Sequence, residues 1–344
     1  MVCTMAVTLR DIARHTGLSK PTVTRILGKD AHLFRAETRK RVIDAARELG
    51  YRPNAAARAV GSGRFGCIAL VLGTSGAQSM VPGPLVHGLQ AELAANDMYL
   101  AVSRLPDEQL SQSGFIPKVL RQSLCDGMLI NYTHNIPPAM LELIRTHDAP
   151  AIWINARLTS DCVHFDDLGA ARGITERLLA LGHRRIAYVA FAWVGDRADR
   201  HYSELDRAAG YAAAMGAAGL PARVHDDRRA ADEQLAWALH VLRAADRPTA
   251  ILTYNEATAT TFYLAAATLG LSVPGDLSLA TFPLTAPVIA GRPWSGAAVP
   301  AMVEGQEAVR AILRKIERPA EVLAPVVVPL TPVVGGATTA PPQP

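Results

Sequence analysis

Short helical patterns of apolar residues fill the first fifty positions, each with a polar outer face. The patterns predict two short helices on either side of a Gly17-Leu18 turn and a third helix over 37–49 that ends at Gly50. The second helix has Ser19 as its cap and Pro21 at its first position. The apolar positions predict a small core between the first two helices, formed by Leu9, Ile12, Ala13, Leu18, Val23, Ile26 and Leu27. The inner stripe of the third helix is Val42, Ala45, Ala46 and Leu49.

From Phe65 onward, apolar strands alternate with amphipathic helices. Continuous apolar strands separated by helices predict α/β architecture, with parallel sheets covered on both faces. The expected strands are 67–72, 99–103, 127–130, 151–154, 186–189, 250–253 and 278–281. The expected helices are 84–96, 116–122, 138–146, 170–181, 206–218, 232–244 and 258–269.

Two further segments have their own composition. The Ala-rich stretch 54–60 is one or two helical turns after an Asn, too short to be stable alone, and 61–63 reads as a flexible joint. The tail 331–344 is rich in Pro, Gly and Thr, which predicts disorder. It has no leucine heptad, so no coiled-coil tetramer is expected.

The outer face of the second helix is polar and basic, with Lys20, Thr22, Thr24 and Arg25. A helix pair of this kind predicts a helix-turn-helix, whose second helix enters a DNA major groove. Through Arg64 there are 13 Lys+Arg against 5 Asp+Glu, or +8, while the remaining residues have 22 against 26, or −4. Positive charge concentrated on the motif favours phosphate contact and salt-sensitive binding over an ordinary solvated surface.

Composition narrows the remaining classes. No long uncharged apolar run predicts a membrane span, and no secretory signal pattern is visible, so a cytoplasmic protein is expected. Four scattered cysteines have no metal-ligand spacing and are expected to be reduced thiols: Cys3, Cys67, Cys125 and Cys162. We find no nucleophile motif, phosphate loop or metal triad, so neither an enzyme, a cofactor nor a metal site is expected. His183 before a strand is interpreted as a helix-end residue rather than a base.

The chain resembles the lactose-repressor (LacI/GalR) family of bacterial transcriptional regulators from Thr8 to about Leu330. The resemblance depends on landmarks that follow one another in the expected order. They are 7–9 (VTL) with 11–13 (DIA), 22–25 (TVTR), 50–54 (GYRPN), 125–130 (CDGMLI), 166–167 (DD), 181–186 (LGHRRI), Arg207 with Gly210 and Tyr211, 255–256 (NE) and 273–278 (VPGDLS).

The resemblance implies a DNA-binding head, a hinge helix and a two-lobed body similar to periplasmic sugar-binding proteins. We expect the helix-turn-helix domain over 1–53 and the hinge helix and linker over 54–64. The N-terminal lobe is expected over 65–163 plus 296–319 and the C-terminal lobe over 164–295 plus 320–330, followed by a disordered tail. The chain crossings are expected near 161–165, 289–295 and 319–322.

Family positions that read bases fall on Lys20, Pro21 and Arg25. Arg25 can donate two parallel bonds to guanine, or alternatively contact only phosphate, whereas Pro21 can only pack, for instance against a thymine methyl. Hydroxyl, imidazole and amide groups at other family positions are expected to contact the DNA backbone. These are Thr8, Thr22, Thr24, His32, Thr38, Tyr51 and Asn54. For His32 alone, a surface histidine without a role is an equal alternative.

The head departs from the family pattern in two places. Phe34 and Arg35 stand where a Val-Ser pair is usual, so the serine cap of the third helix is lost. In the hinge, Ala57 and Val60 face the minor groove, and Val60 replaces the usual wedge leucine with a shorter residue. The alternative for Val60 is packing against the partner's hinge helix.

Family positions that bind an effector between the lobes fall on six residues: Ser75, Asn131, Asn155, Arg207, Asn255 and Phe282. Arg207 is the strongest candidate, because a guanidinium holds hydroxyls, carboxylates or phosphates; an inter-lobe salt bridge is its alternative. The amides can instead satisfy strand-end backbone groups. Asp166 and Asp167 are expected to line the lobe junction or cap the next helix.

The segment 281–284 reads Thr-Phe-Pro-Leu where relatives have an acidic pair. Asn155 also stands where an acid is common. Loss of acceptor carboxylates around a retained arginine favours an anionic effector, such as a sugar acid or sugar phosphate, and equally permits a protein that no longer binds one.

These observations predict a homodimeric, sequence-specific DNA-binding regulator, a repressor by family habit. It binds a pseudo-palindromic operator and is controlled by a carbohydrate-like effector. The competing functions are a stand-alone ligand-binding or transport-type protein, against which the basic head argues, and an α/β enzyme, against which the missing catalytic groups argue.

Overall fold

The computed structural model describes residues 7–52, 63–73, 79–104, 125–133, 136, 138–146, 149–191, 200–227, 229–284, 288–289, 291–333 and 338–342. The chain divides into two compact units, Met1–Phe65 and Gly66–Pro344, and each is described by itself. The expected helix 116–122 and most of the expected hinge, 54–62, lie outside the described residues.

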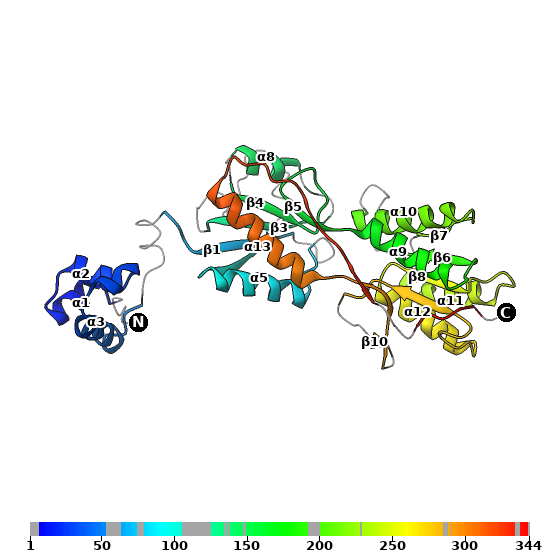
Figure 1. The fold of residues 1–344 in the computed structure, drawn as a ribbon, viewed down its shortest axis with the longest axis horizontal. Coiled ribbons are helices and arrows are strands. Elements are labelled where there is room, and N and C mark those ends of the chain that lie inside the picture. The colour runs from blue at the N-terminus through cyan, green and yellow to red at the C-terminus, as the bar shows by residue number, and fades with distance from the viewer. Residues whose placement is uncertain are drawn as a thin grey trace. The chain divides into compact units, whose positions relative to one another are not determined.

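The first unit, called the head below, packs its helices around one small core (Figure 1). Along the chain they are α1 (Leu9–Thr16), α2 (Lys20–Ile26), the 3-10 helix η1 (Lys29–Leu33) and α3 (Ala36–Glu48). Ile12, Val23 and Val42 are completely buried, and the other apolar residues predicted for the inner sides of the three helices surround them. The predicted helix-turn-helix is therefore confirmed as a fold.

Local chemistry determines where these helices begin and turn. Gly17 has a φ of +65°, a left-handed conformation that glycine adopts without strain, and it lets the chain turn sharply after α1. The Ser19 hydroxyl accepts a hydrogen bond from the backbone N–H of Thr22 at 3.2 Å and so caps α2, in which Pro21 is the second residue. Arg35 precedes α3 without a side-chain cap, as the lost serine predicts.

The second unit, the body, contains two six-stranded sheets. The first follows the order β13-β5-β4-β3-β1-β2, and every neighbouring pair in it is parallel. Its strands are β1 (Cys67–Leu72), β2 (Tyr99–Arg104), β3 (Gly127–Asn131), β4 (Ala151–Ile154), β5 (Cys162–Phe165) and β13 (Val326–Val328).

The second sheet follows the order β14-β12-β9-β8-β6-β7 and is parallel except for the β12–β14 pair. Its strands are β6 (Ile186–Val189), β7 (Arg223–His225), β8 (Ala250–Thr253), β9 (Ser278–Thr281), β12 (Ser295–Ala298) and β14 (Thr331–Val333). A small hairpin of β10 (Val288–Ile289) and β11 (Arg292–Pro293) lies between β9 and β12 along the chain. The α/β fold class with parallel sheets is confirmed.

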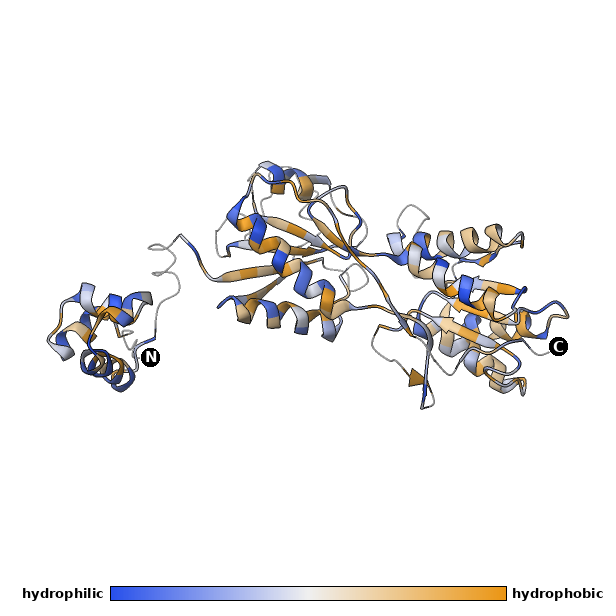
Figure 2. Cartoon of the chain, in the orientation of Figure 1, coloured by the Kyte–Doolittle hydropathy of each residue, from blue (hydrophilic) through white to orange (hydrophobic). Residues whose placement is uncertain are grey.

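Helices cover both faces of each sheet. Side chains of a strand point alternately to opposite faces, so a strand that is apolar at every position needs a helix layer on each side. Ile68 and Leu70 of β1 pack with α5 (Gly83–Ala95) and α13 (Ala301–Glu317), and Ala69 and Val71 pack with α8 (Pro138–Thr146). The second sheet lies between α9 (Asp167–Ala180) with α10 (Tyr202–Ala217) and α11 (Ala231–Arg243) with α12 (Glu256–Thr268). Figure 2 shows the apolar strands inside these layers and polar residues on the outer sides of the helices.

Close contact between α5 and α13 depends on glycine. A Cβ at Gly88 would lie 2.1 Å from the backbone oxygen of Met302, and one at Gly305 would lie 2.7 Å from that of Leu85. Helix α13 is absent from the predicted helices. Its apolar stripe, which includes Ala308, Val309 and Ile312, could have indicated a helix. Glu304 and Gly305 interrupt the stripe in the first half of the helix, and the pattern was missed.

Two predicted lobe boundaries are wrong. The segment 296–319 was expected in the first lobe. Its first residues belong to β12, which pairs with β9 in the second sheet, and only the part that forms α13 packs in the first lobe. Val326–Val328 pairs with β5 in the first sheet, although 320–330 was expected in the second lobe. The crossings therefore follow β5, β12 and β13. Backbone pairing between strands decides these assignments, and the side-chain pattern does not encode it.

The predicted disorder of the tail is also wrong for its described residues. Thr331–Val333 forms β14 beside β12, and Thr338 is completely buried. The Thr338 hydroxyl donates to the carbonyl of Leu279 at 2.6 Å, and the carbonyl of Ala340 lies 2.8 Å from Nε2 of His183. Backbone hydrogen bonds to an existing sheet order this segment despite its composition.

Among the described residues, Cys67, Cys125 and Cys162 are free thiols, as predicted, and burial raises the pKa of each. No group of side chains in the described ranges could hold a metal ion. The search of the same ranges for a helix long and apolar enough to cross a membrane found none.

Candidate DNA-reading face and inter-lobe site

The outer face of α2 is the candidate DNA-reading face. Lys20, Pro21 and Arg25 are all exposed there, while Val23 and Ile26 on the opposite side of the same helix are buried in the head core. Burial of one face sets the rotation of the helix, so it also fixes which side chains point to solvent. The structure therefore leaves the three predicted base-reading residues accessible.

The predicted backbone contacts are less uniform. The hydroxyl of Thr8 donates to Asp11 Oδ2 at 2.7 Å, and that of Thr24 donates to the carbonyl of Lys20 at 2.9 Å. The hydroxyl of Thr22 shares a hydrogen bond with that of Ser19 at 2.8 Å. A hydroxyl has one proton, so Thr8 and Thr24 must rotate before either can donate to a phosphate.

Other head positions lie in different environments. His32 is exposed in η1, Thr38 is half-buried in α3, and Tyr51 packs against the head core. Asn54, Ala57 and Val60 lie outside the described residues. The contact of Tyr51 with the core is a packing role that the sequence did not predict.

Arg25 has two partners in the segment that follows α2. Its Nε donates to Oδ2 of Asp30 at 3.1 Å, and its guanidinium carbon lies 5.5 Å from the ring centre of Phe34. About half of the Arg25 side chain, 53%, remains exposed. Asp30 belongs to η1, and Phe34 follows directly after it.

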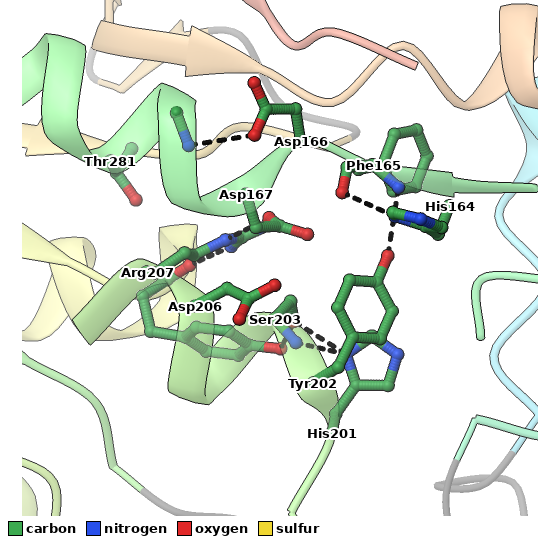
Figure 3. Close-up of polar contacts among 12 residues, drawn as sticks. His164, Phe165, Asp166, Asp167, His201, Tyr202, Ser203, Asp206, Arg207 and Thr281 are labelled. Carbon is green, nitrogen blue, oxygen red and sulfur yellow. Dashed lines mark hydrogen bonds and ion pairs between the residues drawn. The ribbon is translucent and has the colours of Figure 1, made fainter. Parts of the chain in front are cut away.

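In the body, Arg207 occupies the centre of a buried polar cluster (Figure 3). From α10, its Nε donates to Oδ1 of Asp167 at 2.6 Å, and its Nη1 donates to the carbonyl of Tyr254 at 2.5 Å. Its guanidinium carbon lies 4.1 Å from the ring centre of Phe282 and 4.8 Å from that of Tyr254. Burial lowers the pKa of Arg207, because it disfavours the charged guanidinium. The negative charge of Asp167 has the opposite effect, and the pKa of Arg207 lies above its usual value.

The Arg207 ion pair lies within one lobe, because α9 and α10 cover the same sheet. An inter-lobe salt bridge, the alternative considered for Arg207, is instead made by Arg157 and Asp206 at 2.6 Å. Asp166 caps α9 by accepting from the N–H of Gly169 at 2.9 Å. Of the two roles expected for the acidic pair, Asp166 therefore has the helix cap, and Asp167 pairs within its own lobe.

The three asparagines predicted for the effector have different partners. Asn255 caps α12 by accepting from the N–H of Thr258 at 2.9 Å, which is the backbone role considered as its alternative. Nδ2 of Asn131 donates to the carbonyl of Met80 at 2.9 Å. Asn155 has a φ of +53°, a conformation that asparagine tolerates better than most residues. Ser75 lies outside the described residues.

Asn155 lies where the lobes meet. Its carbonyl is 3.0 Å from Nε2 of His201, and its side-chain oxygen accepts from the hydroxyl of Tyr202 at 3.3 Å. The hydroxyl of Tyr202 also accepts from the N–H of Phe165 at 3.1 Å. Figure 3 shows this contact beside His164. These contacts join the end of the first sheet to the start of α10.

Several buried acceptors in this region have no hydrogen-bond partner among the described residues. They are Asn131 Oδ1, Asp167 Oδ2, Glu204 Oε2 and Glu304 Oε1, together with the hydroxyl of Tyr188. Burial raises the pKa of Glu204 and raises that of Glu304 to about 8. Sequence analysis did not identify Glu204, Tyr254 or Glu304. The signal was present for Glu304, a carboxylate on the apolar side of a helical pattern.

Arg207 and Phe282 are therefore in contact, and Asn155 lies at the lobe junction. Asn131 and Asn255 each bond to a backbone group, that of Met80 and that of Thr258. A helix-turn-helix head joined to two α/β lobes defines the class of the protein as a regulator with a body like that of the periplasmic binding proteins.

Comparison with known proteins agrees with this class. Residues 8–54 match the model described as bacterial regulatory proteins, lacI family, and 175–339 match a periplasmic binding protein-like domain. The transcriptional regulator RegA of Clostridium saccharobutylicum is 28% identical over 219 residues, which are 63% of each protein. The probable transcriptional regulator EndR of Paenibacillus polymyxa is 23% identical over 319 residues, 91% of this chain and 92% of that one.

A solved structure of the lac repressor dimer bound to operator and the anti-inducer ONPF has the same fold. It superposes with a TM-score of 0.77 at 22% identity and covers 97% of this chain and 99% of that one. The segment 8–54 thus carries the head of the lacI family of bacterial regulatory proteins, and the relatives found are transcriptional regulators rather than enzymes.

Proposed function

We propose that this chain is a homodimeric repressor that binds a pseudo-palindromic operator with two heads and responds to a small effector bound in the body. One observation carries the DNA-binding part. The polar face of α2, with Lys20 and Arg25, is exposed, while its apolar face is held in the head core. The concentration of positive charge in the first 64 residues, +8, supports the same proposal.

The test of DNA binding is selection from a random duplex pool by the full chain, followed by footprinting of the enriched duplexes. We expect an inverted repeat with two protected half-sites, because a two-fold dimer presents two recognition helices. Enrichment of no sequence would contradict the proposal and favour a stand-alone ligand-binding protein. Enrichment of a single, non-repeated site would contradict the dimer.

For the effector, we propose that the polar groups around Arg207 bind a small carbohydrate-like molecule that is rich in hydroxyl donors. Buried acceptors without partners cost free energy, and hydroxyl donors of a ligand would satisfy them. Asp167 Oδ2 is an acceptor of this kind, and the buried carboxyl of Glu304 also has an oxygen without a partner among the described residues. The Asp167 carboxylate already neutralises Arg207, so an anionic sugar acid or sugar phosphate is supported less by the structure than by the sequence.

Effector control would act through the contacts between lobes. The Arg157–Asp206 ion pair and the Asn155–His201 hydrogen bond both join the first sheet's side to α10. A ligand that prefers one arrangement of the lobes shifts the population toward it, by as much as its affinities for the two arrangements differ.

A thermal-shift screen of neutral sugars, sugar acids and sugar phosphates tests this part. A ligand at about 100 times its Kd should stabilise the folded protein by about 2.7 kcal/mol. We expect the shift from a neutral polyhydroxylated ligand and its loss in Asp167→Asn. A shift from acids alone would restore the anionic effector, and no shift in any class would support a regulator without effector binding.

A further inference from the structure

The side chain of Arg25 is constrained by two residues that come after its own helix. Asp30 accepts from its Nε at 3.1 Å, and the Phe34 ring lies 5.5 Å from its guanidinium carbon. Neither partner belongs to α2, since η1 supplies Asp30 and Phe34 follows η1. The segment 29–34 therefore forms a small support for one exposed side chain.

The contact through Nε determines which donors remain. An Arg25 whose Nε donates to Asp30 keeps Nη1 and Nη2, and neither has a partner within the described part of the head. Two parallel N–H groups at the end of a guanidinium match the O6 and N7 acceptors of guanine. A long side chain otherwise samples many rotamers, and the ion pair with the ring contact selects among them.

The charge of Asp30 has a second consequence. Its side chain is about half exposed, at 49%, beside the face that meets DNA. A carboxylate there repels phosphate oxygens, so it weakens binding to every duplex alike. A penalty common to all duplexes cancels in a ratio of affinities, so an effect of Asp30 on discrimination must act through the geometry of Arg25.

We propose that Asp30 and Phe34 position the Arg25 guanidinium for end-on recognition of guanine and thereby set the sequence discrimination of the head. The inference rests on the proposed DNA-reading function. Asp30 is a positioning residue, since it acts through Arg25 and makes no base contact of its own.

The experiment measures a discrimination ratio for the full chain. A duplex is first selected from a random pool, and each of its base pairs is altered in turn. The pair contacted by Arg25 is the one whose alteration weakens binding of the unchanged protein but not of the Arg25→Ala variant. The ratio is the Kd for the duplex altered at that pair divided by the Kd for the selected duplex. Asp30→Ala, Phe34→Leu and Phe34→Tyr are then compared with the unchanged protein.

We expect Asp30→Ala to lower the ratio by about three- to tenfold, a part of what one bidentate contact supplies. Phe34→Leu should lower it in the same direction, and Phe34→Tyr should keep it, because the ring face is retained. Adding Asp30→Ala to Arg25→Ala should lower the ratio no further. Asp44→Asn, which removes a negative charge from an exposed position on α3, is the matched control. It should tighten binding to all duplexes without changing the ratio.

Three results would overturn the proposal in distinguishable ways. If Arg25→Ala lowers the ratio and Asp30→Ala does not, the positioning role is wrong while the proposed function stands. If Arg25→Ala leaves the ratio unchanged, base reading by Arg25 is wrong, and its support has no purpose. If no duplex is selected, the proposed function itself fails. Thermal melting of each variant separates these results from unfolding of the head.

Discussion

Arg207 donates through Nε to Oδ1 of Asp167 at 2.6 Å, and both side chains are almost completely buried, at 8% and 0% exposure. The two residues are 40 positions apart, on the helices α10 and α9. Their pairing places a neutral ion pair, rather than an isolated cation, at the centre of the candidate effector site.

Removal of one member of this pair should destabilise the body. Asp167→Ala leaves Arg207 buried without its counter-charge, and we expect the free energy of unfolding to fall by about 3–5 kcal/mol. Chemical denaturation measures this change. The control is Glu176→Ala, which breaks the exposed Arg172–Glu176 pair at 2.8 Å and should cost less than about 1 kcal/mol. Equal effects of the two variants would refute the buried-pair argument.

Glu304 should make stability depend on pH. Burial is the main cause that raises its pKa to about 8, from an ordinary value of 4.5 in the unfolded chain. Between these values the folded state holds a proton that the unfolded state has released, so stability falls as pH rises and levels off above the folded pKa. Glu304→Gln removes this dependence, and its stability relative to the unchanged protein should rise from about pH 5 to about pH 9, by about 1–4 kcal/mol.

Urea denaturation across this pH range measures the effect. Glu317→Gln, at an exposed position on the same helix, removes the same charge and serves as the control. A difference between Glu304→Gln and the unchanged protein that is constant across the range would show that Glu304 titrates normally.

The contact between α5 and α13 predicts opposite effects for two glycine substitutions. Gly88→Ala would place its Cβ 2.1 Å from the backbone oxygen of Met302, which forces the helices apart and should cost about 1–3 kcal/mol. Gly173→Ala in α9 meets nothing within 4 Å and should stabilise by about 0.5–1 kcal/mol through helix propensity. Thermal unfolding of both variants decides the point, and similar melting temperatures would contradict the packing described here.

Truncation after Val333 should destabilise the second sheet, although composition alone predicts no effect. It removes the carbonyl of Ala340 from His183 and the hydroxyl of Thr338 from Leu279. Each buried polar group left without a partner costs about 1–3 kcal/mol. Unfolding of the truncated chain by denaturant measures the loss, and a midpoint equal to that of the full chain would restore the disordered tail.

The sequence predicted those parts of the fold that a local pattern encodes. Apolar runs located β1, β4, β6, β8 and β9 to the residue, because a strand buried on both faces is mostly apolar. A local pattern does not indicate which sheet a strand joins. Residues 326–328 and 296–298 were therefore assigned to the wrong lobes.

The candidate site divides in the same way. Arg207 and the exposed residues of α2 follow from motif positions, whereas the partners that limit them do not. The pairing of Arg207 with Asp167 depends on how two helices pack, and that of Arg25 with Asp30 depends on the path of η1. Sequence spacing indicates neither contact. From the sequence, Arg207 was therefore either an effector ligand or part of an inter-lobe salt bridge, and the missing carboxylates favoured an anionic effector.

Competition binding by the intact protein tests most directly the central claim, that the helix α2 reads DNA sequence. The measured quantity is the Kd for a selected duplex against that for a shuffled duplex of equal length at about 0.1 M salt. The account predicts a preference of at least about 10³ that Arg25→Ala reduces, with binding to the shuffled duplex remaining weak and salt-dependent. Equal Kd values for the two duplexes would contradict it.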